Sequence, residues 1–154
     1  MVYERNAWQD RFNQPNPKDL RSVLAADSLA AFDRIHDALK DRDGIEERTA
    51  WYGPCWCWCI EFKVKGASAP LGILIPSPED VQLAMPLDKE FLTQLPMKRM
   101  RRAVRDGLEL ALDPFDSNWS VWSIGPDGLL EELQDVIDRR LKDLQGEGAK
   151  RVAS

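Results

Sequence analysis

A hairpin of two apolar strands, predicted at residues 51–76, constrains the fold more than any other stretch. From Cys55 to Lys65 the sequence alternates with period two. Because successive side chains of a strand point to opposite faces, this pattern predicts one apolar face and one mixed face. The predicted apolar face holds Trp56, Trp58, Ile60, Phe62 and Val64. In the second strand, Leu71, Ile73 and Ile75 are predicted to share a face, and Pro76 ends it.

The elements around the hairpin predict an α+β fold. Apolar residues recur at helical spacing at 29–39 and 130–144, and a further helical segment is predicted within 89–107. Shorter strands are predicted at 46–52, 81–87 and 119–124, and 108–112 fits a helix or a strand. Because strands joined by short turns pair antiparallel, we expect a single domain with an antiparallel sheet of about five strands. Helices lie before, within and after the sheet, and the C-terminal amphipathic helix packs on it.

The chain divides into an N-terminal arm at 1–16, a single domain at 17–145 and a polar tail at 146–154. Hydrophobic residues make up 44% and charged residues 31%, a mixture typical of soluble globular proteins. No stretch has the ~20 consecutive apolar residues that cross a bilayer, and the N-terminus lacks the apolar core of a signal peptide. We therefore expect a cytoplasmic protein that does not enter a membrane.

Three cysteines, Cys55, Cys57 and Cys59, lie within the first strand of the hairpin. Neighbouring thiols on one strand face are about 6–7 Å apart at the backbone, whereas tetrahedral zinc needs four ligands that converge on one point. We therefore expect no metal and no cofactor. Free cysteines are usually buried and inert. Cys57 and Cys59 are the candidates for a reactive thiol, since nearby Lys63 would favour the thiolate.

Tryptophan is unusually common, with six in a chain of 154 residues. Large aromatic rings fill protein cores, and they also line ligand pockets that have a polar group nearby. The sequence leaves both interpretations open. The candidate ligand-binding residues are Trp51, Tyr52, Trp56, Trp58, Trp119 and Trp122.

A run of basic residues at 97–105 contains no acid. At helical spacing Lys98, Arg101, Arg102 and Arg105 share one face, which would contact an anion or an acidic partner. Charge runs on helices are usually solvated, and acids of the closing helix can match these cations within the chain or across a homodimer. The net charge is −5, so nucleic acid is not favoured as a partner.

The sequence resembles the YdhG-like group of small bacterial proteins of unknown function. The resemblance rests on Trp51-Tyr52-Gly53 before a tryptophan-rich strand, on Leu71 to Pro76, on Trp119-Ser120-Val121-Trp122 and on the closing amphipathic helix. It covers residues 17–144. It implies a compact α+β domain with an antiparallel sheet, and it implies no known reaction or catalytic residue.

No motif for nucleophilic, phosphate-binding or metal-dependent catalysis is present in the sequence. The single histidine, His36, is predicted at the edge of the core. We therefore predict a non-catalytic domain that binds a small molecule or a protein through its tryptophan-rich sheet. The alternative is a small cytoplasmic enzyme that uses a cysteine or carboxylate of the sheet. A cysteine that opens into a cleft beside an ionisable partner would favour the enzyme.

Overall fold

The computed structural model describes residues 7–22, 24–42, 44–67, 69–78, 80–110, 119–124 and 129–153. Within these residues, five strands form one open sheet in which each strand pairs antiparallel with the next along the chain. The strands are β1 (Ile45–Trp51), β2 (Trp58–Val64), β3 (Pro70–Ile75), β4 (Gln82–Pro86) and β5 (Trp119–Ser123). The predicted α+β fold with an antiparallel sheet is confirmed.

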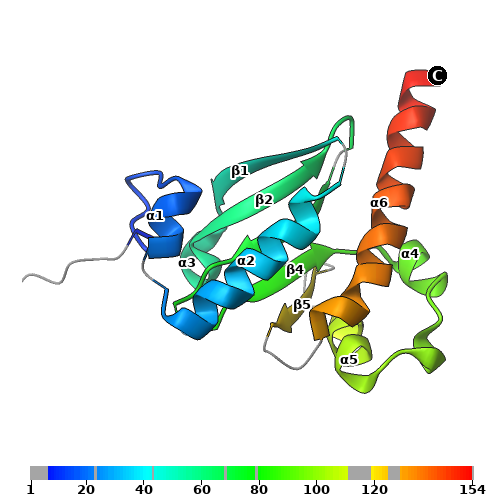
Figure 1. Cartoon of the computed structure of the whole chain (residues 1–154). Helices are drawn as coiled ribbons and strands as arrows, with labels where there is room; N and C mark the ends of the chain where they lie inside the picture. Colours follow the sequence, from blue (N-terminus) through cyan, green and yellow to red (C-terminus); the bar gives the residue numbers. More distant parts are fainter. Residues whose placement is uncertain are drawn as a thin grey trace, which may run out of the picture.

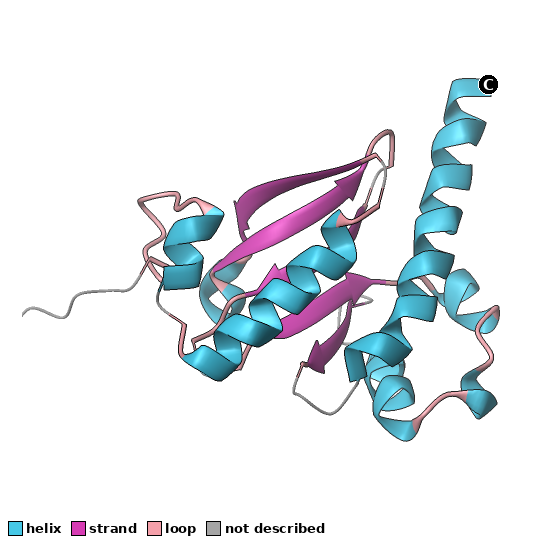
Figure 2. Ribbon diagram, in the orientation of Figure 1, coloured by secondary structure: helices cyan, strands magenta, loops and turns pink. Residues whose placement is uncertain are grey.

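Two long helices, α2 (Ala26–Lys40) and α6 (Leu129–Ala153), lie on one face of the sheet, as Figure 1 and Figure 2 show. The shorter helical segments are α1 (Pro17–Ser22), α3 (Gly53–Trp56), α4 (Lys89–Thr93), the 3-10 turn η1 (Met97–Arg99) and α5 (Arg102–Leu110). α6 continues through most of the predicted polar tail, because each of its two glycines, Gly146 and Gly148, costs a helix only about 1 kcal/mol relative to alanine. In the described part of the chain, no helix combines the length and the apolar character of a membrane span.

The main core lies between the sheet and these two helices. Trp58, Ile60, Phe62 and Val64 of β2 all point into it, which confirms the predicted apolar face over these four residues. The helical stripes opposite them are Phe32, Ile35 and Leu39 of α2 and Leu133, Ile137 and Leu144 of α6. Burying one such side chain stabilises the fold by about 1.5–3 kcal/mol. The predicted apolar periods of the strand and of both helices therefore meet in one core.

β2 begins later than the alternating pattern predicts, because residues 53–56 form the single helical turn α3. Pro54 occupies one of the first positions of this turn, where its fixed φ suits a helix and its missing N–H is not needed. Cys57 closes the turn: its N–H donates to the Gly53 carbonyl, and its carbonyl accepts from Tyr52 N, each at 2.8 Å. The prediction that Trp56 lies on the apolar face is therefore wrong, since its ring packs on the other side of the sheet.

A bulge between β2 and β3 reverses the faces that the side chains of β3 take. Phe62 pairs with Gly72 and Lys63 pairs with Pro70, so Leu71 is an extra residue on β3. An extra residue reverses which face the following side chains take. Leu71 therefore enters the main core, whereas Ile73 and Ile75 point to the opposite face, so the prediction that the three residues share one face is wrong.

α5 meets β5 at a very close contact. Trp122 of β5 is buried, and its indole Nε1 donates to the Val104 carbonyl of α5 at 3.2 Å. Gly107 of α5 lies against the same ring, and a Cβ added at Gly107 would overlap the indole of Trp122. The absence of a side chain at Gly107 therefore sets the distance between helix and strand.

We predict that Gly107→Ala destabilises the protein by about 1–3 kcal/mol, because the added methyl group overpacks the contact with Trp122. Gly146→Ala is the matched control, since nothing beyond its own helix backbone lies within 4 Å of the added Cβ. In an exposed helix, alanine should stabilise by about 0.5–1 kcal/mol. Urea unfolding measures both changes, and equal stability of the two variants would contradict the close contact.

Candidate functional site

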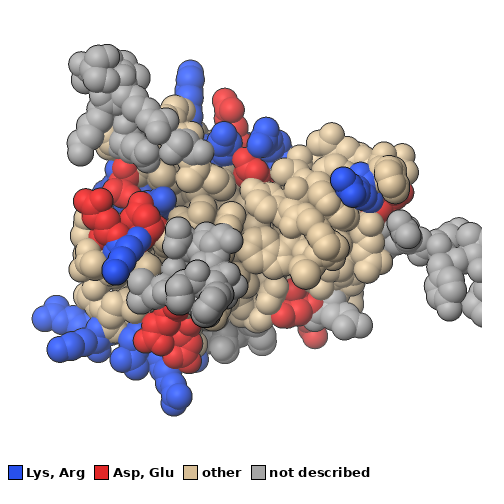
Figure 3. All heavy atoms as spheres, turned by 180° about the vertical axis from the view of Figure 1, so that it is seen from behind, with Lys and Arg blue, Asp and Glu red and all other residues tan. Residues whose placement is uncertain are grey.

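The second face of the sheet, which we call the back face, carries aromatic rings where the first face carries helices. A small cluster is buried beneath it: Cys59, Ile73, Ile75 and Ala84. The partly buried side chains that pack on this cluster are Trp8, Tyr52, Trp56, Trp119 and Val121, and none of those described comes from α2, α5 or α6. Figure 3 views the molecule from this side and shows a broad uncharged area with Lys, Arg, Asp and Glu around its rim.

Three of these rings, Tyr52, Trp56 and Trp119, form what we call the aromatic patch. The Trp119 ring meets Tyr52 at a centroid distance of 5.9 Å and Trp56 at 5.3 Å, both nearly perpendicular. Tyr52 and Trp56 are 6.3 Å apart. Edge-to-face pairs of this kind stabilise by about 0.5–1.5 kcal/mol beyond their burial. All three rings remain partly exposed, so the patch presents aromatic surface to solvent.

A buried carboxylate holds the tyrosine of the patch in place. Glu61, whose side chain is only 7% exposed, accepts a hydrogen bond of 2.6 Å from the Tyr52 hydroxyl. Its other oxygen accepts from Nε and Nη2 of Arg48, each at 3.2 Å. Burial of the phenol, together with the bond to Glu61, raises the pKa of Tyr52 far above its usual value, so the hydroxyl stays protonated and donates. The Arg48 side chain is 66% exposed and carries charge to the rim of the patch.

The N-terminal arm is hydrogen-bonded, through Trp8, to Trp56 of α3. Trp8 Nε1 donates to the Trp56 carbonyl at 2.9 Å, and the Trp8 carbonyl accepts from Trp58 N at 3.2 Å. Trp58 Nε1 in turn donates to the Asp10 carbonyl at 2.6 Å. Sequence reasoning missed Trp8 and Arg48, although the facing of Arg48 and Glu61 follows from the antiparallel pairing of β1 with β2.

The other three candidate tryptophans do not join the patch. Trp51 and Trp58 pack edge to face at 5.5 Å on the helix-covered side of the sheet. Trp58 and Trp122 are buried. The structure therefore divides the six candidate aromatic residues equally, with three in or against the main core and three on the back face.

The cysteines do not lie on one strand face, so that prediction is wrong. Cys55 is exposed on α3, whereas Cys57 and Cys59 are buried and donate weakly to the carbonyls of Pro54 and Trp56. Burial raises the pKa of both buried thiols, although a reactive cysteine needs the opposite shift and access to solvent. The geometry therefore does not favour Cys57 or Cys59 as a reactive thiol.

Cys57 has an unusual backbone conformation, with φ 57° and ψ −137°. Residues other than glycine rarely adopt this region, and holding one there costs about 1–3 kcal/mol. The conformation reverses the chain between α3 and β2. It therefore sends the Trp56 ring to the back face while Trp58 stays in the main core.

His36 joins α2 to β1 at the edge of the main core. Its Nε2 lies 2.7 Å from a Glu47 oxygen, and its Nδ1 lies 3.5 Å from Asp37. The ring stacks on Phe32 and meets Phe62 edge to face. Both nitrogens face carboxylates rather than a nucleophile, which agrees with a boundary histidine.

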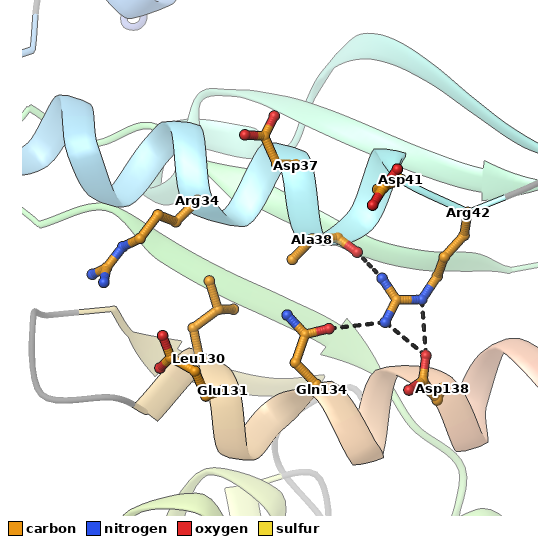
Figure 4. A pocket seen from close by; sticks show the side chains of 9 residues that line it. All are labelled: Arg34, Asp37, Ala38, Asp41, Arg42, Leu130, Glu131, Gln134 and Asp138. Atoms are coloured by element: carbon orange, nitrogen blue, oxygen red, sulfur yellow. Dashed lines mark hydrogen bonds and ion pairs between the residues drawn. The ribbon is translucent and has the colours of Figure 1, made fainter.

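A polar hollow of about 590 Å³ lies between α2 and α6, and Figure 4 shows its lining. Arg42 dominates one end, where its guanidinium bonds to Asp138, to Gln134 and to the Ala38 carbonyl. Each nitrogen of this guanidinium already has a protein acceptor. Arg42 therefore links α2 to α6 and has no free nitrogen for a ligand. The aromatic patch is a better candidate site than this hollow.

The basic residues do not form one helical face, which corrects the sequence prediction. Met100 has an extended backbone and separates η1, which holds Lys98, from α5, which holds Arg102 and Arg105. Arg101 lies between them and pairs with Glu132 of α6 at 3.6 Å. The sequence analysis suggests that acids of the closing helix pair with these cations, and the Arg101–Glu132 ion pair is such a contact.

No protein-family model matches the chain, and no curated protein matches it. The resemblance to the YdhG-like group therefore stays a prediction. Among the described residues, no three His, Cys, Asp or Glu side chains gather where they could hold a metal ion.

We predict that Cys57→Gly is more stable than Cys57→Ala by about 1 kcal/mol or more, because only glycine adopts this backbone without strain. Both variants remove the same buried thiol. The same pair of changes at Cys55, inside α3, should give the usual order with alanine the more stable. Thermal unfolding of the four variants measures the two differences, and the same order at both positions would contradict the backbone assignment.

We also predict a loss of stability above about pH 8.5, where a thiol in the unfolded chain ionises. The raised pKa of Cys59 keeps its proton in the folded state. The unfolded state then binds fewer protons, so stability present at lower pH falls by up to about 1.4 kcal/mol per pH unit for this group. Urea unfolding between pH 8 and 10 should show a shallower decline for Cys59→Ala than for Cys55→Ala. Identical slopes would contradict the prediction.

Proposed function

We propose that the chain is a non-catalytic protein-binding domain whose contact surface is the aromatic patch. One observation carries this proposal: Tyr52, Trp56 and Trp119 pack on one another, stay partly exposed and lie where the sheet lacks a long described helix. Residues that dominate protein interfaces are enriched in tryptophan, tyrosine and arginine. The patch has two tryptophans and a tyrosine, and the exposed guanidinium of Arg48 lies at its rim.

The packing of the rings supports a protein partner over a small ligand. Centroid distances of 5.3–6.3 Å place the rings in mutual contact, so no ligand fits between them. An apolar side chain of a partner can instead pack on their outer faces. Before binding, the hydrogen bond to Glu61 holds the Tyr52 ring, and the hydrogen bond from Trp8 Nε1 to the Trp56 carbonyl holds the backbone that carries the Trp56 ring. This ordering lowers the entropy lost on association.

An enzyme that uses a sheet cysteine or carboxylate has less support. Glu61 is already engaged by Tyr52 and Arg48, and Cys59 is buried with a raised pKa. The cytoplasmic location remains a prediction from the sequence.

Selection from a phage-displayed peptide library tests the proposal. We expect selected peptides with aromatic or aliphatic anchors, and we expect Trp119→Ala or Trp56→Ala to weaken their binding about 30-fold, as for an interface hot spot. Leu110→Ala is the control, because this side chain is apolar and 43% exposed but lies at the end of α5. Thermal unfolding verifies that each variant folds. Peptides that bind the patch variants as tightly as the parent protein would refute the proposal.

A further inference from the structure

The two edges of the sheet differ in how their backbone groups are satisfied. The strand order makes β1 and β5 the edge strands, and Figure 1 shows them at opposite ends of the sheet. In an antiparallel pair, opposite residues alternate between pairs that exchange hydrogen bonds and pairs whose N–H and C=O point away from the partner strand. On an edge strand, the outward-pointing groups are available to a further strand.

The edge at β1 is protected by other parts of the chain. Gln14 Nε2 donates to the Thr49 carbonyl at 3.2 Å, and Lys40 Nζ donates to the Ile45 carbonyl at 3.4 Å. Both carbonyls point away from β2, since the even-numbered residues of β1 exchange hydrogen bonds with that strand. Residues 46–48 are all charged, and charged side chains on an edge strand oppose pairing with another chain.

The outward groups of β5 follow from its register with β4. Ile124 N donates to the Val81 carbonyl at 3.2 Å, and this pair continues the register of the two strands. Bonded and non-bonded pairs alternate from there, so every second residue of β5 points its N–H and C=O to the outer edge. These residues are Trp119, Val121 and Ser123. Pro86, which has no N–H, lies opposite Trp119, as a non-bonded pair allows.

The edge at β5 is open within the part of the chain that the structure describes. There, no hydrogen bond reaches the backbone N–H or C=O of Trp119, Val121 or Ser123. α5 packs on the face of β5, because the side chains of Ser120 and Trp122 donate to carbonyls of that helix. Trp119 and Val121 are partly exposed, and Ser123 is exposed. β5 also contains no proline and no charged residue, so it lacks the usual devices that prevent pairing at an edge.

We propose that an extended segment of a partner protein adds to the sheet as a further strand beside β5. The outward groups alternate N–H donors with C=O acceptors along the strand, and the backbone of a second strand matches that order. Trp119 and Val121 lie on the back face, so β-branched or aromatic side chains at every second position of the segment would pack beside them.

The charge of the chain favours such a segment over a second copy. Two copies would each bring a net charge of −5 to the contact, whereas an uncharged or basic segment avoids this repulsion. The inference goes beyond the proposed function, because its contacts are backbone groups of β5. It shares only Trp119 with the aromatic patch.

A short fluorescein-labelled peptide that alternates valine with threonine and ends in lysine tests the proposal by fluorescence anisotropy. We expect saturable binding at physiological salt and about tenfold weaker binding to Val121→Pro. Proline at this position removes one outward N–H and leaves the hydrogen bonds to β4 in place. Val121→Thr is the matched control, because it keeps the N–H and the branched shape, and it should change affinity less than about twofold. Urea unfolding verifies that both variants fold.

N-methylation of the peptide repeats the test on the unchanged protein. Every second amide of an added strand faces β5, and a methyl group on those amides blocks the hydrogen bonds. One peptide is methylated at its valines and a second at its threonines. We expect one of the two to bind at least about tenfold more weakly and the other to retain its affinity. An equal effect of both modifications would overturn the proposal.

Three further results decide between this inference and its alternatives. Absence of saturable binding by the unmodified peptide would overturn it. A dimer of the parent chain in analytical ultracentrifugation that Val121→Pro dissociates would assign the edge to a second copy and overturn the partner segment. Peptide binding that survives Trp56→Ala but is weakened by Val121→Pro would support the edge and count against the aromatic patch as the contact surface.

Discussion

The burial of β2 on both of its faces is the constraint on which the rest of the structure depends. From Trp58 to Val64, every residue except Lys63 is buried. A sheet with such an interior strand needs cover on two sides. α2 and α6 cover one side, and on the other the described cover consists of aromatic side chains from the arm, α3 and β5. When both faces of a sheet are buried, helices usually cover both of them. Here aromatic rings take the place of a helix on the back face, and the surface that they form is partly exposed to solvent.

Glu61, the buried carboxylate of β2, links the stability of the sheet to the arrangement of the aromatic patch. A carboxylate as buried as Glu61 must be paired and hydrogen-bonded, since an unpaired buried charge is very costly. Arg48 supplies the charge and Tyr52 supplies a hydrogen bond. The same hydrogen bond fixes where the Tyr52 ring lies against Trp119. The need to satisfy one carboxylate therefore also orders the aromatic patch.

Periodic features of this fold could be predicted from the sequence, and features set by single residues could not. The period-two run from Trp58 to Val64 and the helical spacing in α2 and α6 identified the main core, because burial imposes those periods. Asp88 is of a residue type that commonly caps helices, and at the start of α4 its carboxylate accepts from Phe91 N at 2.7 Å. The turn at Pro54, the extra residue Leu71 and the break at Met100 are backbone events that leave the apolar pattern unchanged. The first moved Trp56 and the third moved Lys98 away from its predicted face, and the second separated Leu71 from Ile73 and Ile75.

The division of the tryptophans between two environments gives the protein a built-in optical reporter. Trp58 and Trp122 are buried, and their emission follows the integrity of the main core. Trp56 and Trp119 are partly exposed on the back face, where removal of water shifts indole emission to shorter wavelength. Unfolding and occupation of the back face therefore displace the spectrum in opposite directions, and no external dye is needed to tell them apart.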